Sequence, residues 1–237
     1  MDIGIKLFSE DLPIVREFID VADYLEIMIQ PDFPYAGLKE YDLPYTIHAP
    51  HHKFGVNIAD STLLEHNLRR VHQSVEAADY LNADWIILHP GELINDYCSI
   101  ENAKIFLDRI ADDRIILENL PYKLKDYLHL THTPDEMKEF LDVVPGICLD
   151  FAHTVAGKPG EDYKTLIREF AKMKPKVFHI SDSHKSTGID EHIALGDGDL
   201  DLEYFKQIIN ASKSKKVTIE TPPSRRRHME EVVFLRK

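Results

Sequence analysis

Eight short apolar segments, separated by helical patterns, constrain the fold of this 237-residue chain more than any other feature. They are Ile3–Phe8, Tyr24–Ile29, Tyr45–His48, Trp85–His89, Ile115–Glu118, Ile147–Asp150, Val177–Ile180 and Val217–Glu220. Each is rich in β-branched residues or leucine, and its apolar character is nearly continuous rather than alternating. This pattern indicates parallel strands that are buried on both faces of a sheet.

Helical patterns occupy most of the intervals between these segments. They are Ser9–Asp20, Ser61–Leu81, Ile100–Ala111, Thr133–Val143, Glu161–Met173, Leu202–Ala211 and His228–Arg236. The clearest start is Thr133 followed by Pro134, because threonine caps helix N-termini and proline suits the first helical position.

Eight strands that alternate with helices predict an α/β fold, a (β/α)8 TIM barrel, whose usual length is about 250 residues. A doubly wound open sheet is the alternative. Its dinucleotide site has no support, since no Gly-x-Gly-x-x-Gly motif follows the first segment. Neither a linker nor a repeat divides the chain, so we expect residues 1–237 to form a single domain.

Composition excludes several classes of protein. Asp and Glu total 41 against 28 Lys and Arg, and the net charge of -13 disfavours a broad polyanion-binding surface. No apolar run approaches the ~20 residues of a membrane helix, and the first residues do not form a signal peptide. Cys98 and Cys148 are far apart in the sequence, which predicts a reducing, cytoplasmic setting. No obligate protein partner can be read from the sequence.

Histidines and carboxylates gather where the predicted strands end. The carboxyl ends of barrel strands meet at the active-site face, so these side chains should converge. The converging residues are His48, His89, Glu118, Asp150, His153, His179, Asp190, His192 and Glu220. A single histidine at a strand end is more often a hydrogen-bonded core residue. Six consecutive strands that end in this way favour a metal centre.

The mixture of side chains indicates which metals would bind. Bare carboxylates this close together would repel one another, and burying them unpaired is costly. Imidazole mixed with carboxylate suits zinc, manganese or iron better than magnesium or calcium. Three or four protein ligands per ion would allow two or three ions, with a carboxylate bridging two of them.

Six motifs carry a family resemblance. They are His-Pro-Gly at 89–91, Glu-Asn at 118–119, Asp-x-x-His at 150–153, His-x-x-Asp-Ser at 179–183, Asp-x-His with Leu-Gly-x-Gly at 190–198, and Glu-Thr-Pro at 220–222. From about Tyr45 to Pro222 the chain resembles the xylose isomerase-like barrel superfamily. Within it, the chain most closely resembles the endonuclease IV family, also called AP endonuclease family 2.

The resemblance implies a trinuclear zinc centre. His48 and His89 would bind one zinc, which Glu118 would bridge to a second zinc. Asp150, His179 and Glu220 would complete the second site, and His153, Asp190 and His192 would hold the third zinc. Mn²⁺ or Fe²⁺ could replace zinc. The implied activity is metal-dependent phosphodiester hydrolysis that incises DNA 5′ to abasic sites. We predict Glu118 and Glu220 as the catalytic residues.

A sugar isomerase or epimerase of the same superfamily is the alternative. One metal held by Glu118, Asp150, His179 and Glu220 would serve it, with the two glutamates moving protons on a ketose. Those enzymes usually present an arginine after the seventh strand, where this chain has Asp190-Glu191-His192. The endonuclease family inserts side chains into DNA from loops near its first three strands. Here those loops are short, so a sugar or a small phosphate ester also remains open as the substrate.

Basic residues near the predicted strand ends could bind substrate phosphate. They are His51, His184, Lys185, Arg225 and Arg226. The two arginines could instead form a solvated start of the last helix, although cations are unfavourable at a helix N-terminus. His66, His72, His129 and His132 lie away from strand ends and are predicted to be structural or exposed.

Overall fold

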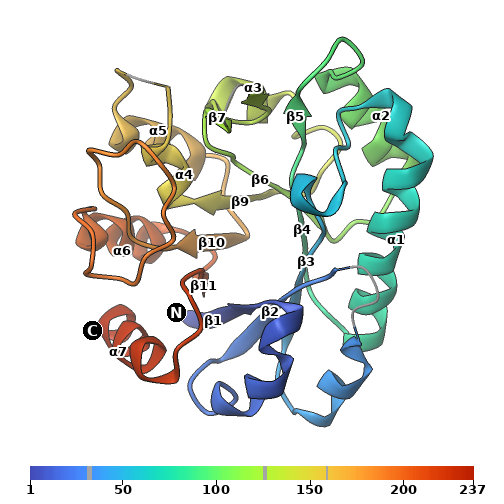
Figure 1. Cartoon of the computed structure of the whole chain (residues 1–237). Helices are drawn as coiled ribbons and strands as arrows, with labels where there is room; N and C mark the ends of the chain where they lie inside the picture. The colour runs from blue at the N-terminus through green and yellow to red at the C-terminus, as the bar shows by residue number, and fades with distance from the viewer. Residues whose placement is uncertain (31–33, 125–126, 159) are drawn as a thin grey trace.

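The computed structural model describes residues 1–30, 34–124, 127–158 and 160–237, and its strands close into a barrel (Figure 1). The barrel strands are β1 (Asp2–Leu7), β2 (Tyr24–Met28), β3 (Tyr45–His48), β4 (Ile86–Leu88), β6 (Ile115–Glu118), β9 (Ile147–Asp150), β10 (Val177–Ile180) and β11 (Lys216–Ile219). Neighbours pair in parallel in the order β1-β11-β10-β9-β6-β4-β3-β2. The predicted (β/α)8 barrel is confirmed, and each of the eight apolar segments forms one strand.

Helices surround the barrel, with α1 and α2 on one side of it and α4, α5 and α6 on the other (Figure 1). The α-helices are α1 (Leu64–Leu81), α2 (Ile100–Ile110), α3 (Pro134–Lys138), α4 (Phe151–Val155), α5 (Tyr163–Ala171), α6 (Leu202–Ala211) and α7 (Arg225–Arg236). The 3-10 helices are η1 (Ser9–Glu17), η2 (Tyr35–Glu40), η3 (His52–Phe54) and η4 (Ser61–Leu63).

Several predicted helices differ in type or bounds from those observed. The first is the 3-10 helix η1, since Pro13 lies inside it and cannot donate an α-helical hydrogen bond. The helix that begins after Thr133 ends at Lys138, and the chain continues in turns to Val143. The last helix begins at Arg225, three residues earlier than predicted. Its first turn is therefore the arginine run itself.

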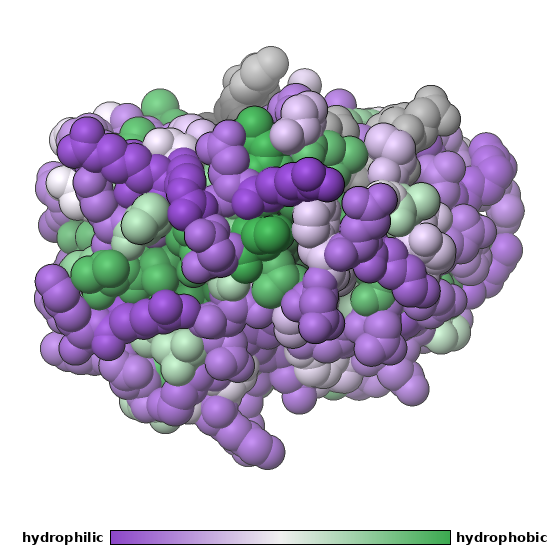
Figure 2. All heavy atoms as spheres, turned by 90° about the horizontal axis from the view of Figure 1, so that it is seen from below, coloured by the Kyte–Doolittle hydropathy of each residue, from purple (hydrophilic) through white to green (hydrophobic). Residues whose placement is uncertain are grey.

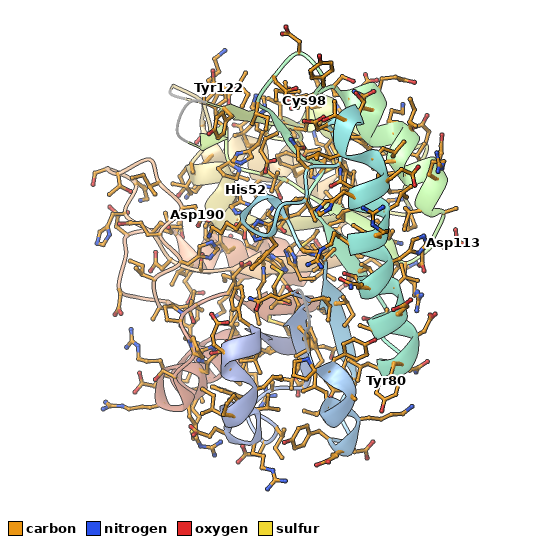
Figure 3. All side chains as sticks on the ribbon, turned by 45° about the vertical axis from the view of Figure 1, so that its right-hand side comes forward. His52, Tyr80, Cys98, Asp113, Tyr122 and Asp190 are labelled. Atoms are coloured by element: carbon orange, nitrogen blue, oxygen red, sulfur yellow. The ribbon has the colours of Figure 1, made fainter. Side chains whose placement is uncertain are left out.

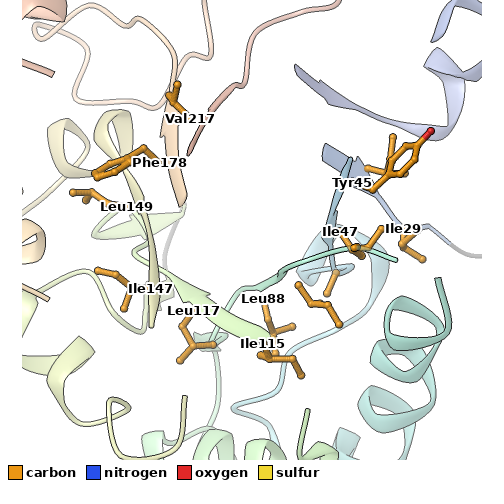
Figure 4. Close-up of a cluster of buried hydrophobic side chains, with 14 of the residues drawn as sticks. Ile29, Tyr45, Ile47, Leu88, Ile115, Leu117, Ile147, Leu149, Phe178 and Val217 are labelled. Atoms are coloured by element: carbon orange, nitrogen blue, oxygen red, sulfur yellow. The ribbon is translucent and has the colours of Figure 1, made fainter. Parts of the chain in front are cut away.

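Alternation along the strands separates two buried layers. Ile115, Leu117, Ile147 and Leu149 belong to the large cluster between sheet and helices (Figure 4). A second cluster lines the inner face of the barrel, and its members are Ile87, Ile116, Cys148 and Val177. Side chains two residues apart share a face of a strand. Glu118, Asp150 and His179 therefore point inward above Ile116, Cys148 and Val177.

A polar network fills the barrel beneath the strand ends. The Tyr24 ring occupies the space beside Gly4, because a Cβ atom at residue 4 would lie only 2.3 Å from the ring. Thr218 Oγ1 donates to Glu26 Oε2 at 2.7 Å and accepts from Tyr24 Oη at 2.7 Å. The barrel interior is therefore polar beneath the strand ends, where the ionisable side chains lie.

A small antiparallel sheet stands beside the carboxyl ends of the barrel strands. It consists of β5 (Glu92–Leu93), β8 (Tyr127–His129) and β7 (Lys123–Leu124), in the order β5-β8-β7. Glu92 pairs directly with His129 across the first two strands. Figure 2 shows one face of the molecule, where hydrophilic side chains surround smaller hydrophobic patches. No helix in the described part of the chain has the length and apolar character needed to cross a membrane.

Candidate metal centre

The nine predicted ligand-type side chains meet at the carboxyl ends of the barrel strands. They form three groups, and within each group the candidate ligand atoms lie within 4.8 Å of one another. The groups are His48, His89 and Glu118; Glu118, Asp150, His179 and Glu220; and His153, Asp190 and His192. This partition is the one that the family resemblance implies for three ions.

Glu118 joins the first two groups through its two carboxylate oxygens. Oε2 lies 3.2 Å from Nε2 of His48 and 3.2 Å from Nε2 of His89. Oε1 lies 3.0 Å from Nδ1 of His179. One oxygen thus faces each group, which is the arrangement that a bridging carboxylate requires.

The second group surrounds Nδ1 of His179. That nitrogen lies 2.9 Å from Glu220 Oε2 and 3.8 Å from Asp150 Oδ2. Both oxygens are buried, and neither makes a hydrogen bond within the described part of the chain. Buried carboxylate oxygens without hydrogen bonds are costly unless a positive charge approaches them.

The third group depends on a helix cap. Asp150 Oδ1 accepts from the backbone N–H of His153 at 2.8 Å and so caps the short helix α4. The Asp-x-x-His spacing therefore holds both side chains at one strand end. Asp190 Oδ2 then lies 3.2 Å from Nε2 of His153 and 2.6 Å from Nε2 of His192.

Asp182 organises the loop that carries Asp190 and His192. Its carboxylate accepts from the backbone N–H groups of Gly196, Gly198 and Leu200. A Cβ atom at residue 198 would lie 2.4 Å from Asp182 Oδ1, so this approach requires glycine. The Asp-Ser motif therefore binds the backbone of the Leu-Gly-x-Gly motif, and this contact holds the loop in place.

Backbone carbonyls orient three of the imidazoles. Nδ1 of His48 donates to the carbonyl of Ala49 at 2.8 Å, and Nδ1 of His153 donates to that of Asn119 at 2.7 Å. Nδ1 of His192 donates to the carbonyl of Glu220 at 3.1 Å. The Nε2 atom of each ring is thereby directed at a carboxylate of its group. Metal-binding histidines are held in this way.

The ionisation of the groups depends on their neighbours. Burial acts to raise the pKa of Glu118, but His179, then His48 and His89, hold it well below its usual range. Burial raises the pKa of Asp150 to about 6. Burial acts to lower the pKa of His192, but Glu220 and Asp190 raise it to about 9. Without metals, protonated imidazoles therefore supply the positive charge that these carboxylates require.

The residues fit divalent transition metals. Imidazole and carboxylate donors converge in sets of three or four, the usual number of protein ligands for zinc. Asp150 Oδ2 and Glu220 Oε2, which make no hydrogen bond with any described residue, point into the second set. Asp190 Oδ1, in the third set, is likewise buried without a hydrogen bond in the described part of the chain. Cations held in the second and third sets would satisfy these atoms.

Two charged residues beneath the metal centre were not predicted to take part in it. Lys6 Nζ lies 2.6 Å from Glu220 Oε1 and 3.8 Å from Glu26 Oε1. Glu26 Oε2 lies 3.0 Å from Nε2 of His179 and fixes that ring from the side opposite the second group. The signal was available in the sequence, because each residue is a charged side chain within an otherwise apolar strand.

A cavity of about 550 Å³ opens above the centre. His89, His153 and Glu220 contribute to its wall, and so does His51, whose ring stacks on that of His89 with centroids 4.6 Å apart. Burial, then His89, lowers the pKa of His51 well below its usual range. His51 therefore lines the cavity as a neutral imidazole, and its substrate-binding role stays a prediction. His52 follows His51 in the sequence, and Figure 3 shows Asp190 on the same side of the molecule as the segment that carries His52.

The other four predicted phosphate-binding residues lie elsewhere. Among the described residues, the cavity wall does not include His184, Lys185, Arg225 or Arg226. Arg225 binds the carboxylate of Asp20 at 2.6 and 2.8 Å, and Arg226 binds Glu230 at 3.1 Å along its own helix. Because α7 begins at Arg225, both arginine side chains are directed to acidic partners outside the cavity wall, and the phosphate-binding role of the four residues stays a prediction.

His129 is the opposite case. The sequence placed it away from the site, but it is buried at the cavity wall. Its neighbour Glu92 was not predicted to have a role either. The pairing of β5 with β8 brings Glu92 beside His129, and this small sheet was not among the predicted strands.

Comparison with known proteins agrees with this architecture. The xylose isomerase-like TIM barrel family profile matches residues 36–237. An uncharacterized protein of Methanocaldococcus jannaschii is 28% identical over 214 residues, which cover 85% of this chain and 81% of that protein. A probable endonuclease 4 of Staphylococcus carnosus is 25% identical over 211 residues, covering 78% and 69%. Apurinic-apyrimidinic endonuclease 1 of Plasmodium falciparum is 24% identical over 216 residues, covering 78% and 35%.

Solved structures show the same fold. A D-tagatose 3-epimerase-like protein superposes with a TM-score of 0.82 at 21% identity and covers 100% of this chain and 96% of its own. Endonuclease IV of Thermus thermophilus superposes with a TM-score of 0.73 at 19% identity, covering 100% and 98%. Together with the profile match over most of the chain, these similarities establish that the chain belongs to the xylose isomerase-like TIM barrel family.

Proposed function

We propose that this protein is a metal-dependent phosphodiester hydrolase of the endonuclease IV type, which incises DNA on the 5′ side of abasic sites. The observation that carries the proposal is the convergence of nine ligand-type side chains in three groups around Glu118. An isomerase that uses one metal needs only the second group. The additional groups suit a trinuclear centre. They are His48 with His89, and His153 with Asp190 and His192.

The three groups would hold two or three divalent transition metals. Zinc is the first candidate, and manganese or iron could replace it. Bound there, they would supply Lewis-acid stabilisation of the charge that develops on a phosphodiester. Glu118 would connect the first two groups, and Glu220 would complete the second beside Lys6. The family relationship and the sequence similarity to proteins named as endonucleases support this assignment.

The chain's own residues define how a substrate would enter. His51 stacks on His89 at the cavity wall, where its imidazole could donate to a phosphate oxygen. The cavity is also bounded by apolar side chains such as Met28, Phe54 and Leu120. We propose that these side chains contact the sugar next to the phosphate. Because the net charge is -13, DNA binding would be local to this mouth.

A sugar isomerase or epimerase remains the second candidate, and the size of the cavity favours it. A volume of about 550 Å³ suits a small molecule, since ligand pockets usually measure roughly 300–1,000 Å³. Glu118 Oε1 and Glu220 Oε2 both face Nδ1 of His179, at 3.0 and 2.9 Å. In this reading, the two glutamates would move protons between adjacent carbons of a ketose.

One experiment tests the first candidate. Zinc-loaded protein is incubated with a duplex oligonucleotide that carries one abasic site, and the products are separated on a denaturing gel. We expect a single cut 5′ to the abasic site and none in the intact duplex. Glu118→Gln should reduce the rate at least about 100-fold, because it removes the carboxylate shared by two groups.

The matched control is Glu76→Gln, on the exposed face of α1, which should cut at the wild-type rate. A panel of ketoses is tested in parallel by following exchange of the carbon-bound proton in deuterated water. Exchange without DNA incision would replace the hydrolase proposal by the isomerase reading. Incision that Glu118→Gln leaves intact would remove Glu118 from the centre.

A further inference from the structure

The cavity wall carries another cluster of ligand-type side chains, outside the nine residues of the metal centre. His52 begins η3, Glu92 lies on β5 and His129 ends β8. Their candidate ligand atoms lie within 4.8 Å of one another. We propose that His52, Glu92 and His129 form an additional site for a zinc-class divalent cation on the wall of the cavity.

The carboxylate of Glu92 is the centre of this cluster. Its side chain is 2% exposed, and Oε1 makes no hydrogen bond with any described residue. Nevertheless, Oε1 lies 3.1 Å from Nδ1 of His52 and 3.9 Å from Nε2 of His129. A buried carboxylate oxygen between two imidazole nitrogens, without hydrogen bonds of good geometry, is what a cation would satisfy.

The imidazole of His129 is oriented for metal binding. Its Nδ1 donates to the carbonyl oxygen of Pro121 at 2.9 Å, so the lone pair of the neutral ring is on Nε2. That nitrogen faces Glu92. A histidine whose second nitrogen donates to a backbone carbonyl is the usual supporting arrangement for a metal ligand.

The backbone beneath Glu92 is held firmly. The amide of Asn57, a buried side chain, accepts from the N–H of Glu92 at 3.0 Å and donates to its carbonyl at 2.9 Å. Glu92 and His129 are also direct partners across the β5–β8 pair, so their side chains lie on one face of that sheet. Two of the three ligands are therefore pre-positioned, and His52 supplies the third from a separate turn.

The donor set indicates the type of ion. Two imidazoles and one carboxylate suit zinc or a similar transition metal, with donor distances of roughly 2.0–2.2 Å. Ligand atoms 3 to 4 Å apart can reach such distances by small rotations of the side chains. His52 and His129 both line the cavity, so the fourth coordination position would face it. Three protein ligands with one open position are the pattern of zinc sites that accept a ligand.

A metal count tests the proposal independently of any activity. Wild type, His52→Asn, Glu92→Gln and His129→Gln are each dialysed to equilibrium at the same free zinc concentration, and bound zinc is measured by mass spectrometry. We expect each variant to bind one equivalent less than wild type. His72→Asn, on the exposed face of α1, should match wild type. An unchanged count in His52→Asn, whose side chain is 28% exposed and thus the most exposed of the three, would overturn the proposal.

Two further measurements distinguish metal binding at this site from metal binding at the larger centre. The double variant His52→Asn/His153→Asn should bind one equivalent less than His153→Asn alone, which separates this site from the larger centre. Anomalous diffraction from zinc-soaked wild-type crystals should place a peak between the three side chains, and its absence at saturating zinc would contradict the site. Neither result depends on DNA incision, so this proposal and the proposed function can fail separately.

Discussion

At the scale of single residues, Glu26 shows how the interior of the barrel supports the candidate centre. It is fully buried, accepts from Thr218 and lies 3.0 Å from Nε2 of His179. Burial acts to raise its pKa, but His179 and then Lys6 keep it below the usual value. An ionised carboxylate behind a histidine fixes the ring and increases its basicity as a ligand.

Replacement of Glu26 by glutamine should therefore weaken metal binding without emptying the site. We expect a loss of roughly 10- to 100-fold in zinc affinity, the usual effect of removing such a supporting carboxylate. Competition with a chromophoric chelator measures it. Glu76→Gln, on the surface of α1, is the matched control and should bind zinc like wild type. Equal affinity in both variants would show that Glu26 does not support His179.

A second prediction at this scale concerns pH. In the metal-free chain the pKa of His192 is about 9, and the carboxylates of Asp150 and Asp190 raise that of His153 against the opposing effect of burial. Both imidazoles thus hold a proton at neutral pH, and a metal must displace it. Zinc affinity should rise from about pH 6 to about pH 8, by roughly tenfold per unit for each proton released. Chelator competition across this range measures the slope, which His192→Asn should reduce. A flat profile would contradict the assignment.

At the scale of elements, the turn between β4 and β5 connects the two sets of ligands. Gly91 has a φ of +107°, and a Cβ atom there would lie 2.2 Å from Asn57 Oδ1 and 2.9 Å from the backbone nitrogen of Ala59. His89 lies on one side of this turn and Glu92 on the other. Glycine at residue 91 thus allows β4 to end at the metal centre and the chain to continue into β5 beside that centre.

Gly91→Ala should therefore destabilise the fold by at least about 2 kcal/mol, because backbone strain and a steric overlap coincide. Urea denaturation measures the change as a lower midpoint. Gly37→Ala is the control, since its added Cβ would meet no atom within 4 Å. We expect that variant to stay within about 0.5 kcal/mol of wild type. A similar midpoint for Gly91→Ala would mean that the turn can rearrange.

At the scale of the whole molecule, the candidate centre concentrates carboxylates in a protein that already carries a net charge of -13. Glu26, Glu118 and Asp150 are all essentially buried, and Glu220 stands beside them. Burying such charges opposes folding unless cations or protonated imidazoles compensate them. Metal binding should therefore contribute to the stability of the entire barrel.

Removing the metals should lower the melting temperature. Zinc at about 100 times its dissociation constant stabilises the folded state by about 2.7 kcal/mol, which corresponds to roughly 5–10 °C in a domain of this size. Differential scanning calorimetry with EDTA and after zinc is restored measures the shift. A protein with Glu118→Gln should show a smaller shift. Identical melting temperatures with and without zinc would contradict a metal centre in the core.

Much of this architecture could be predicted, because the relevant patterns are local. Continuous apolar runs of strand length predicted the barrel, and ligand-type residues at or shortly after the strand ends predicted the convergence of the nine residues. The direction of Arg225 was not predictable in the same way. Its position depends on where α7 begins, and its partner Asp20 lies 205 residues away in the sequence.

The sequence alone determined which residues end the barrel strands. The period of two along a strand puts Glu118, Asp150 and His179 on the inner face regardless of the loops. Only the tertiary structure decided which other side chains join them. Closure of the barrel pairs β1 with β11 and so brings Lys6 beside Glu220, and the pairing of β5 with β8 brings Glu92 to His129. Such contacts depend on strand closure and loop packing between distant segments, and no local period of the sequence encodes them.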